Sequence, residues 1–143
     1  MTPRRAPLQD RLLAAAGAAA CLALLLVAAA LTPNGQGLGT HTDLGMPECG
    51  WITAFQKPCP TCGMTTSFAH AADGRFLAAA AVQPAGAILA VAAAAGFWTC
   101  LHAALFGSRI ARLFAPLWRP RFIIAGAAIL LLAWFYKLAL WTN

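Results

Sequence analysis

The sequence predicts an all-α membrane protein with three transmembrane helices and one or two short interfacial or re-entrant helices in the first loop. Hydrophobic residues make up 61% of the 143 residues and charged residues only 10%, with a mean hydropathy of +0.71. A soluble domain carries about 25% charged residues, so this chain cannot cover a water-facing surface. The composition excludes a soluble globule, a disordered chain and a nucleic-acid-binding protein. It predicts a single membrane domain over residues 1–143, with the lipid bilayer as its partner.

Three runs are long and apolar enough to cross a bilayer, whose core of roughly 30 Å needs about 20 helical residues. The runs 12–31 and 85–106 contain no charged side chain, and Pro84 suits the first turn of the second helix. The run 122–140 contains only Lys137, whose ammonium we expect to reach the headgroups. An interfacial aromatic belt is expected at the same end, formed by Trp134, Tyr136 and Trp141.

The first run also resembles a signal peptide, because arginines precede it. Signal peptides, however, contain an apolar stretch of about 7–15 residues and a cleavage site of small residues. Residues 12–31 exceed that length, and no clear cleavage site precedes residues 32–35. A lipoprotein cleavage at Cys21 would cut inside the run. We therefore expect an uncleaved transmembrane helix.

Basic residues predict the orientation in the membrane. Seven arginines lie in the N-terminal tail and in the loop between the second and third runs: Arg4, Arg5, Arg11, Arg109, Arg112, Arg119 and Arg121. The loop 32–84 has only Lys57 and Arg75, against three acidic residues. The positive-inside rule places the N-terminus and the arginine-rich loop in the cytoplasm, and the loop 32–84 and the C-terminus on the exoplasmic side. The net charge of +6 then reflects topology and calls for no nucleic-acid partner.

The loop 32–84 changes in composition along its length. Residues 33–45 are rich in Gly and Thr and predict irregular chain. Two prolines precede a predicted short helix over 62–72, which we expect Gly74 to cap. A second short apolar piece covers 76–83. Both are too short to cross, so we expect them to lie in the interface or to form a re-entrant hairpin.

Three of the five cysteines lie in this loop and could act as one unit. They are Cys49, Cys59 and Cys62, and the last two form a Cys-Pro-Thr-Cys motif. His70 follows eight residues after Cys62, about two helical turns further along. We expect the three sulfur atoms to converge, because the cysteines flank a proline-rich turn.

Three interpretations of these residues stay open. Thiolates and imidazole are preferred donors of zinc, so the three cysteines and His70 form a candidate tetrahedral metal site. Cys59 and Cys62 instead form a candidate redox pair, in which the N-terminus of the short helix lowers the pKa of the Cys62 thiol. A structural disulfide from Cys49 to Cys59 or Cys62 also suits an oxidising compartment and leaves one cysteine over.

The other chemically active side chains have simpler explanations. We expect Cys21 and Cys100 to pack inside the spans, His41 to be solvated and His102 to hydrogen-bond between helices. Near the start of the short helix, three hydroxyls are candidates for capping or for binding an anion: Thr65, Thr66 and Ser67. The sequence has no Ser/His/Asp order, no phosphate-binding glycine loop and no paired intramembrane carboxylates, so we do not expect an enzyme.

The cysteine segment resembles the bacterial membrane proteins grouped as domain of unknown function 2752. The resemblance rests on Cys49, on the stretch Pro58-Cys59-Pro60-Thr61-Cys62-Gly63-Met64-Thr65, and on Gly74 and Pro84 at their spacings. Three positions depart from the family's pattern: Thr66 replaces an Arg, Arg75 an Asp and Gln83 an Asn. The family has no assigned activity, so the resemblance implies a bacterial cytoplasmic membrane location, the architecture and the cysteine cluster.

Two classes of function therefore remain. The first is a structural or accessory membrane subunit, in which Gly86, Gly96 and Gly126 allow helices to approach each other or a partner closely. The second is a metal-binding or thiol-redox protein that works at the exoplasmic face through its loop cysteines.

Overall fold

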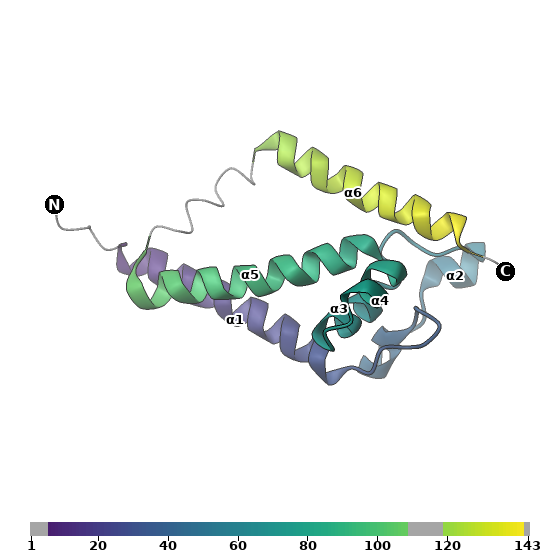
Figure 1. Ribbon diagram of the computed structural model, residues 1–143, viewed down its shortest axis with the longest axis horizontal. Coiled ribbons are helices and arrows are strands. Elements are labelled where there is room, and N and C mark those ends of the chain that lie inside the picture. The colour runs from purple at the N-terminus through teal and green to yellow at the C-terminus, as the bar shows by residue number, and fades with distance from the viewer. Residues whose placement is uncertain (1–5, 109–118, 142–143) are drawn as a thin grey trace.

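The computed structural model describes residues 6–108 and 119–141, which form helices and no strand (Figure 1). In chain order these are α1 (Leu8–Ala30), the 3-10 helix η1 (Thr40–Leu44), α2 (Gly50–Phe55), α3 (Met64–Ala72), α4 (Phe76–Val82), α5 (Pro84–Phe106) and α6 (Pro120–Ala139). The predicted all-α class is confirmed. The helices α1, α5 and α6 are each long and apolar enough to cross a membrane.

The three predicted spans agree with these helices, with small shifts at their ends. The largest shift is in α1, which begins at Leu8 rather than at residue 12, directly after Pro7. This added turn carries Arg11, whose guanidinium donates hydrogen bonds to the carbonyl oxygens of Ala104 (2.9 Å) and Leu105 (3.1 Å). Carbonyls in the last turn of a helix have no partner within the helix, so Arg11 provides the hydrogen-bond donors that two carbonyls at the C-terminal end of α5 need.

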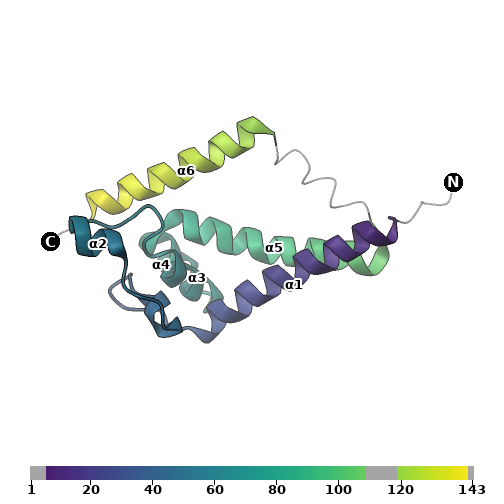
Figure 2. The same ribbon diagram turned by 180° about the vertical axis from the view of Figure 1, so that it is seen from behind.

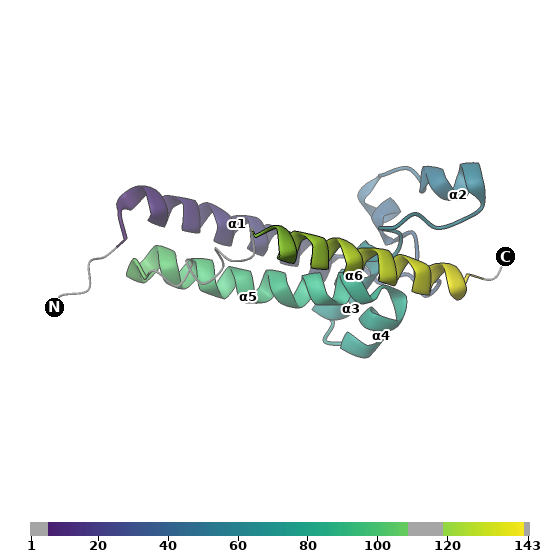
Figure 3. The same ribbon diagram turned by 90° about the horizontal axis from the view of Figure 1, so that it is seen from above.

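The helices α1 and α5 run side by side in opposite directions (Figures 1 and 3). Their contact is built from small residues, and in it Gly17 of α1 and Gly96 of α5 each face a cysteine of the other helix. A Cβ added at Gly17 would lie 3.3 Å from Cys100 Sγ, and one added at Gly96 would lie 3.5 Å from Cys21 Sγ. This close approach is typical of membrane helices, and it agrees with a packing role for both cysteines.

The short helices α3 and α4 form a hairpin where α1 and α5 diverge. Phe68 and Ala71 of α3 and Ala79 of α4 share one apolar core with Ala28 of α1 and Ala87 of α5. The predicted helix over 62–72 begins two residues late, because the backbone of Gly63 is left-handed (φ +83°) and lies outside the helix. The predicted glycine at its end is confirmed, since Gly74 has φ +75° directly after the last helical turn.

Two elements of the loop 32–84, hereafter the cysteine loop, were not predicted. Instead of irregular chain throughout 33–45, the structure contains η1, with left-handed glycines at Gly39 and Gly45 on either side. The helix α2 was also missed, and the residue that caps its C-terminal end is Gln56, whose φ is +56°. Both elements are too short to give a periodic pattern of apolar residues.

The helix α6 meets the rest of the protein at its C-terminal end, whereas its N-terminal half stands away from α5 (Figure 2). Lys137 does not follow the expectation that its ammonium reaches the headgroups. Its Nζ turns inward and donates to the carbonyl oxygens of Gly37 (3.2 Å) and Val82 (3.0 Å). The physical reason is that these carbonyls lie beside the last turns of α6 and need a donor.

Candidate functional site

The three loop cysteines form a cluster, as predicted. Cys62 Sγ lies 3.2 Å from Cys59 Sγ and 3.2 Å from Cys49 Sγ. All three sulfur atoms lie within 4.8 Å of one another, and none forms a disulfide. Cys62 is buried, while Cys49 and Cys59 are partly exposed.

Local backbone geometry brings the sulfur atoms together. Cys49 directly precedes α2, and Cys59 and Cys62 enclose a tight turn in which the Cys62 N–H donates to the Cys59 carbonyl oxygen (3.1 Å). The Cys59 N–H in turn donates to Cys62 Sγ (3.3 Å), and the Thr61 hydroxyl lies 3.3 Å from Cys59 Sγ. Prolines at 58 and 60 restrict the turn, so the two sulfurs are held on one side of it.

The thiols of the cluster differ in acidity. Burial raises the pKa of Cys49, but hydrogen bonds from the Cys62 thiol and from the N–H groups of Ile52 and Trp51 together lower it to about 7. Burial, reinforced by its contacts with the other two thiols, raises the pKa of Cys62 above its ordinary value. The predicted lowering at Cys62 is therefore wrong. The N-terminus of a helix does act on a thiol, but the helix is the unpredicted α2 and the thiol is that of Cys49.

A cavity of about 630 Å³ opens beside the cluster, and all three cysteines line it. His41 and Glu48 also line this cavity. The His41 ring is partly buried, and its Nε2 lies 3.2 Å from the carbonyl oxygen of Pro47, so it is less solvated than expected. The cluster therefore has one open side, which faces a space of the size that small ligands occupy.

His70 lies apart from the cluster. It belongs neither to the group of close metal-ligand atoms nor to the residues that line the cavity. Six helical residues separate it from the start of α3, a rise of roughly 9 Å, and this carries the imidazole away from Cys62. Its Nδ1 is buried and has no hydrogen-bond partner within the described residues.

Side chains from the end of the cysteine loop and from α6 onward hold the segment around the cluster in place. Three donors satisfy backbone carbonyls around the cluster: Gln83 bonds Pro60 (3.0 Å), Trp134 bonds Pro58 (2.9 Å) and Trp141 bonds Gln56 (3.0 Å). The ring of Trp134 also packs edge-on against Trp51 of α2, with 5.9 Å between centroids. The sequence indicated none of these contacts, because it predicted only an interfacial belt for the tryptophans.

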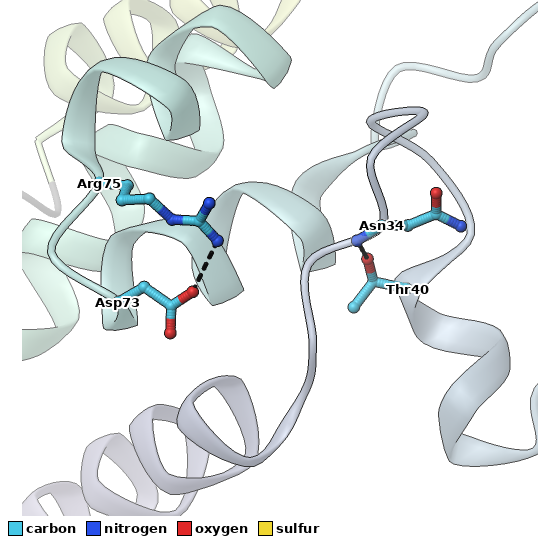
Figure 4. A network of polar contacts seen from close by, with 4 residues as sticks. All are labelled: Asn34, Thr40, Asp73 and Arg75. Atoms are coloured by element: carbon cyan, nitrogen blue, oxygen red, sulfur yellow. Dashed lines mark hydrogen bonds and ion pairs between the residues drawn. The ribbon is translucent and has the colours of Figure 1, made fainter.

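The three positions expected to depart from the family's pattern, Thr66, Arg75 and Gln83, each have a partner within the structure. Thr66 is fully buried, and its hydroxyl lies 2.8 Å from that of Thr40, which also accepts a hydrogen bond from the Asn34 N–H (Figure 4). The same view shows Arg75 paired with Asp73 at 2.8 Å on the exposed turn between α3 and α4. The third such position, Gln83, is fully buried beside the cysteine turn.

Of the remaining candidates, Ser67 and His102 have internal partners, whereas Thr65 lines the cavity beside the cysteines. Ser67 donates to the carbonyl oxygens of Ala79 (2.9 Å) and Gln83 (3.0 Å) and thereby joins α3 to α4. His102 is exposed, and its Nδ1 lies 2.9 Å from the Ser108 hydroxyl. His102 therefore contacts a residue just beyond the end of its own helix, α5, and not another helix as expected.

Together these features define a small helical protein with three candidate membrane spans and a cluster of three thiols beside their ends. A model of the family described as "Protein of unknown function (DUF2752)" matches residues 47–97, and the expected family resemblance is confirmed over this segment. The matched segment contains all three cysteines of the cluster, the α3–α4 hairpin and the first half of α5. No curated protein and no solved structure matches the chain.

Proposed function

We propose that the protein binds a soft divalent metal ion, with zinc as the leading candidate, through Cys49, Cys59 and Cys62. The convergence of the three sulfur atoms within 4.8 Å is the observation that carries the proposal. At a Zn–S distance of about 2.3 Å, tetrahedral coordination separates two sulfurs by about 3.8 Å. The two 3.2 Å contacts therefore need to open by only about half an ångström.

Three thiolates leave the fourth position of a tetrahedral ion free. That position would face the cavity, where water, an incoming small ligand or His41 is available as a donor. Ligation by His70 stays a prediction, and the distance along α3 does not favour it. A metal uses all three thiols at once, whereas a disulfide would join two and leave the third without a covalent role.

Within this proposal the metal has a structural consequence for the membrane protein. It would join α2, which has no buried residue, to the proline-rich turn and the start of α3. The protein would then act as a membrane subunit whose cysteine loop is ordered by metal. The orientation predicted from the arginines places this loop on the exoplasmic side.

The test is metal analysis of full-length protein purified in detergent with reductant and without chelator, together with thiol counting. We expect about one bound zinc and three thiols protected from alkylation until a chelator is added. Matched controls are Cys21→Ser and Cys100→Ser, which should retain the metal, while Cys49→Ser, Cys59→Ser and Cys62→Ser should lose it. Protein without metal and with two thiols missing would instead identify a disulfide.

A second function, thiol–disulfide exchange, is favoured by one observation, the lowered pKa of Cys49. The Cys49 thiolate would attack a partner disulfide and release one partner thiol. Cys62, 3.2 Å away, would then attack Cys49 Sγ and release the second partner thiol, leaving a Cys49–Cys62 disulfide. Reduction of a small aromatic disulfide by the metal-free protein, abolished by Cys49→Ser, is the test of this function.

A further inference from the structure

The ammonium of Lys137 lies next to the cysteine cluster. Lys137 is half-buried, and its Nζ is held by the carbonyl oxygens of Gly37 and Val82. Gly63, the residue that follows Cys62, packs directly against it, because a Cβ added at Gly63 would collide with Lys137 Nζ. Lys137 of α6 thus places one positive charge beside the turn that carries Cys59 and Cys62.

No carboxylate balances this charge among the described residues. All four acidic side chains of the chain lie in the described part, and none is within 4.0 Å of Lys137. Gly63, which lies against Nζ, directly follows Cys62, so the groups beside the ammonium that are able to take up a negative charge are the thiols of the cluster. A partly buried ammonium in a membrane helix is costly unless an opposite charge faces it, so the cysteine cluster is where such a charge would develop.

Metal binding would create that opposite charge. Three thiols lose their protons to solvent when they bind a metal ion as thiolates. Three thiolates and one divalent ion then carry a net charge of minus one, which the Lys137 ammonium cancels. Next to a bilayer the local dielectric is low, so a neutral site is strongly favoured over a site with a net negative charge.

We infer that Lys137 is the counter-ion that allows all three cysteines to bind one divalent metal ion as thiolates. This inference rests on the proposed metal site and adds a residue from α6 to it. It also explains why the side chain turns inward and not toward the headgroups. Lys137 would not touch the metal, and its role would be to stabilise the charge of the ligands that do.

Titration of the reduced full-length protein with Co²⁺, followed by Zn²⁺ competition, tests the inference through the thiolate-to-cobalt charge-transfer absorbance. Lys137→Gln removes the charge and keeps a polar N–H donor on a side chain that is one bond shorter. We expect it to lower the Zn²⁺ affinity about tenfold or more and to reduce the charge-transfer absorbance per cobalt. Lys137→Arg keeps the charge and should bind within about threefold of the parent.

The matched control is Lys57→Gln, an exposed lysine of the same loop, which should bind metal as the parent does. Thermal melting separates a counter-ion from a purely structural lysine. A counter-ion predicts that Lys137→Gln reduces the gain in melting temperature on adding metal, beyond any fall that the change causes in the metal-free protein. Equal Zn²⁺ affinity in Lys137→Gln and parent, or an equal fall in melting temperature with and without metal, would overturn the inference. A parent that binds neither ion would refute the metal site itself, and the role of Lys137 with it.

Discussion

Within the cysteine cluster, each sulfur atom has its own environment although the three are in contact. Cys49 precedes α2 and receives hydrogen bonds from backbone N–H groups, whereas Cys62 is 7% exposed. The same contact therefore stabilises the thiolate at Cys49 and the neutral thiol at Cys62. In the metal-free protein the first negative charge should form at Cys49.

This difference predicts a pH profile for alkylation of the reduced, metal-free protein by iodoacetamide. The rate at Cys49 should rise through about pH 7, because hydrogen bonds to its sulfur lower the pKa of the thiol to about 7. Cys62 should react slowly over the same range, since burial and a raised pKa both keep it protonated. Peptide mass spectrometry assigns the sites, and Cys49→Ser should remove the fast phase. A profile at Cys49 centred near pH 9 would contradict the proposed environment.

Substitution of single ligands should separate a three-thiolate site from one that includes His70. With zinc in about hundredfold excess over its Kd, the metal stabilises the fold by about 2.7 kcal/mol, or roughly 5–10 °C in Tm. We expect Cys59→Ser and Cys62→Ser to lose this gain, and Cys21→Ser and Cys100→Ala to keep it. His70→Ala should also keep it, because the imidazole is absent from the cluster. An equal loss in His70→Ala would instead establish His70 as a ligand.

Among the elements, the α3–α4 hairpin depends on a close approach between α3 and α5. A Cβ added at Gly86 would lie 2.8 Å from Ser67 Cβ and 2.9 Å from Ser67 Oγ. Ser67 cannot move freely, since its hydroxyl joins the carbonyls of Ala79 and Gln83. Gly86 therefore fixes how deeply the hairpin packs between α1 and α5.

Gly86→Ala should accordingly destabilise the protein by about 1–3 kcal/mol, the range typical of overpacking a closed contact. Thermal unfolding in detergent measures the effect, and Gly126→Ala is the matched control, because nothing lies within 4 Å of its added Cβ. Ser67→Gly in the Gly86→Ala background should recover part of the loss. Equal stability of the Gly86→Ala and Gly126→Ala variants would contradict the close packing of α3 on α5.

Sequence reasoning succeeded where a local property sets the structure and failed where distant partners do. The three spans follow from length and apolarity, and the α3–α4 hairpin follows from its prolines and from Gly74. By contrast, α2 is stabilised by Trp134, and η1 is fixed by the bond between Thr40 and Thr66. The inward position of Lys137 also depends on distant partners, since its acceptors lie 100 and 55 residues away in the chain. The convergence of the cysteines was predictable from spacing, whereas the charge beside them was not.

At the scale of the whole molecule, the helices define two ends that differ in chemistry. The C-terminal ends of α1 and α6 and the start of α5 gather near the cysteine loop, and the first turn of α1 and the last turn of α6 lie at opposite ends of the described part (Figure 1). At the other end Arg11 binds the last turn of α5. Three alternating spans therefore put the cysteine loop and the turn after α5 on opposite sides of any membrane that they cross.

The orientation of the protein in the membrane is a prediction from the distribution of its basic residues. Four of the seven arginines concerned, Arg4, Arg5, Arg109 and Arg112, lie outside the described residues, so their contribution is argued from sequence alone. Seven arginines against Lys57 and Arg75 favour a cytoplasmic N-terminus. Fusions truncated after Gly74 and after Ser108, carrying a reporter active only outside the cytoplasm, should be active at Gly74 and silent at Ser108. The reverse pattern would invert the orientation and place the thiol cluster in the reducing cytoplasm, which favours metal over a disulfide still further. Equal activity at both positions would contradict three spans, because α5 is the one candidate span between the two fusion points.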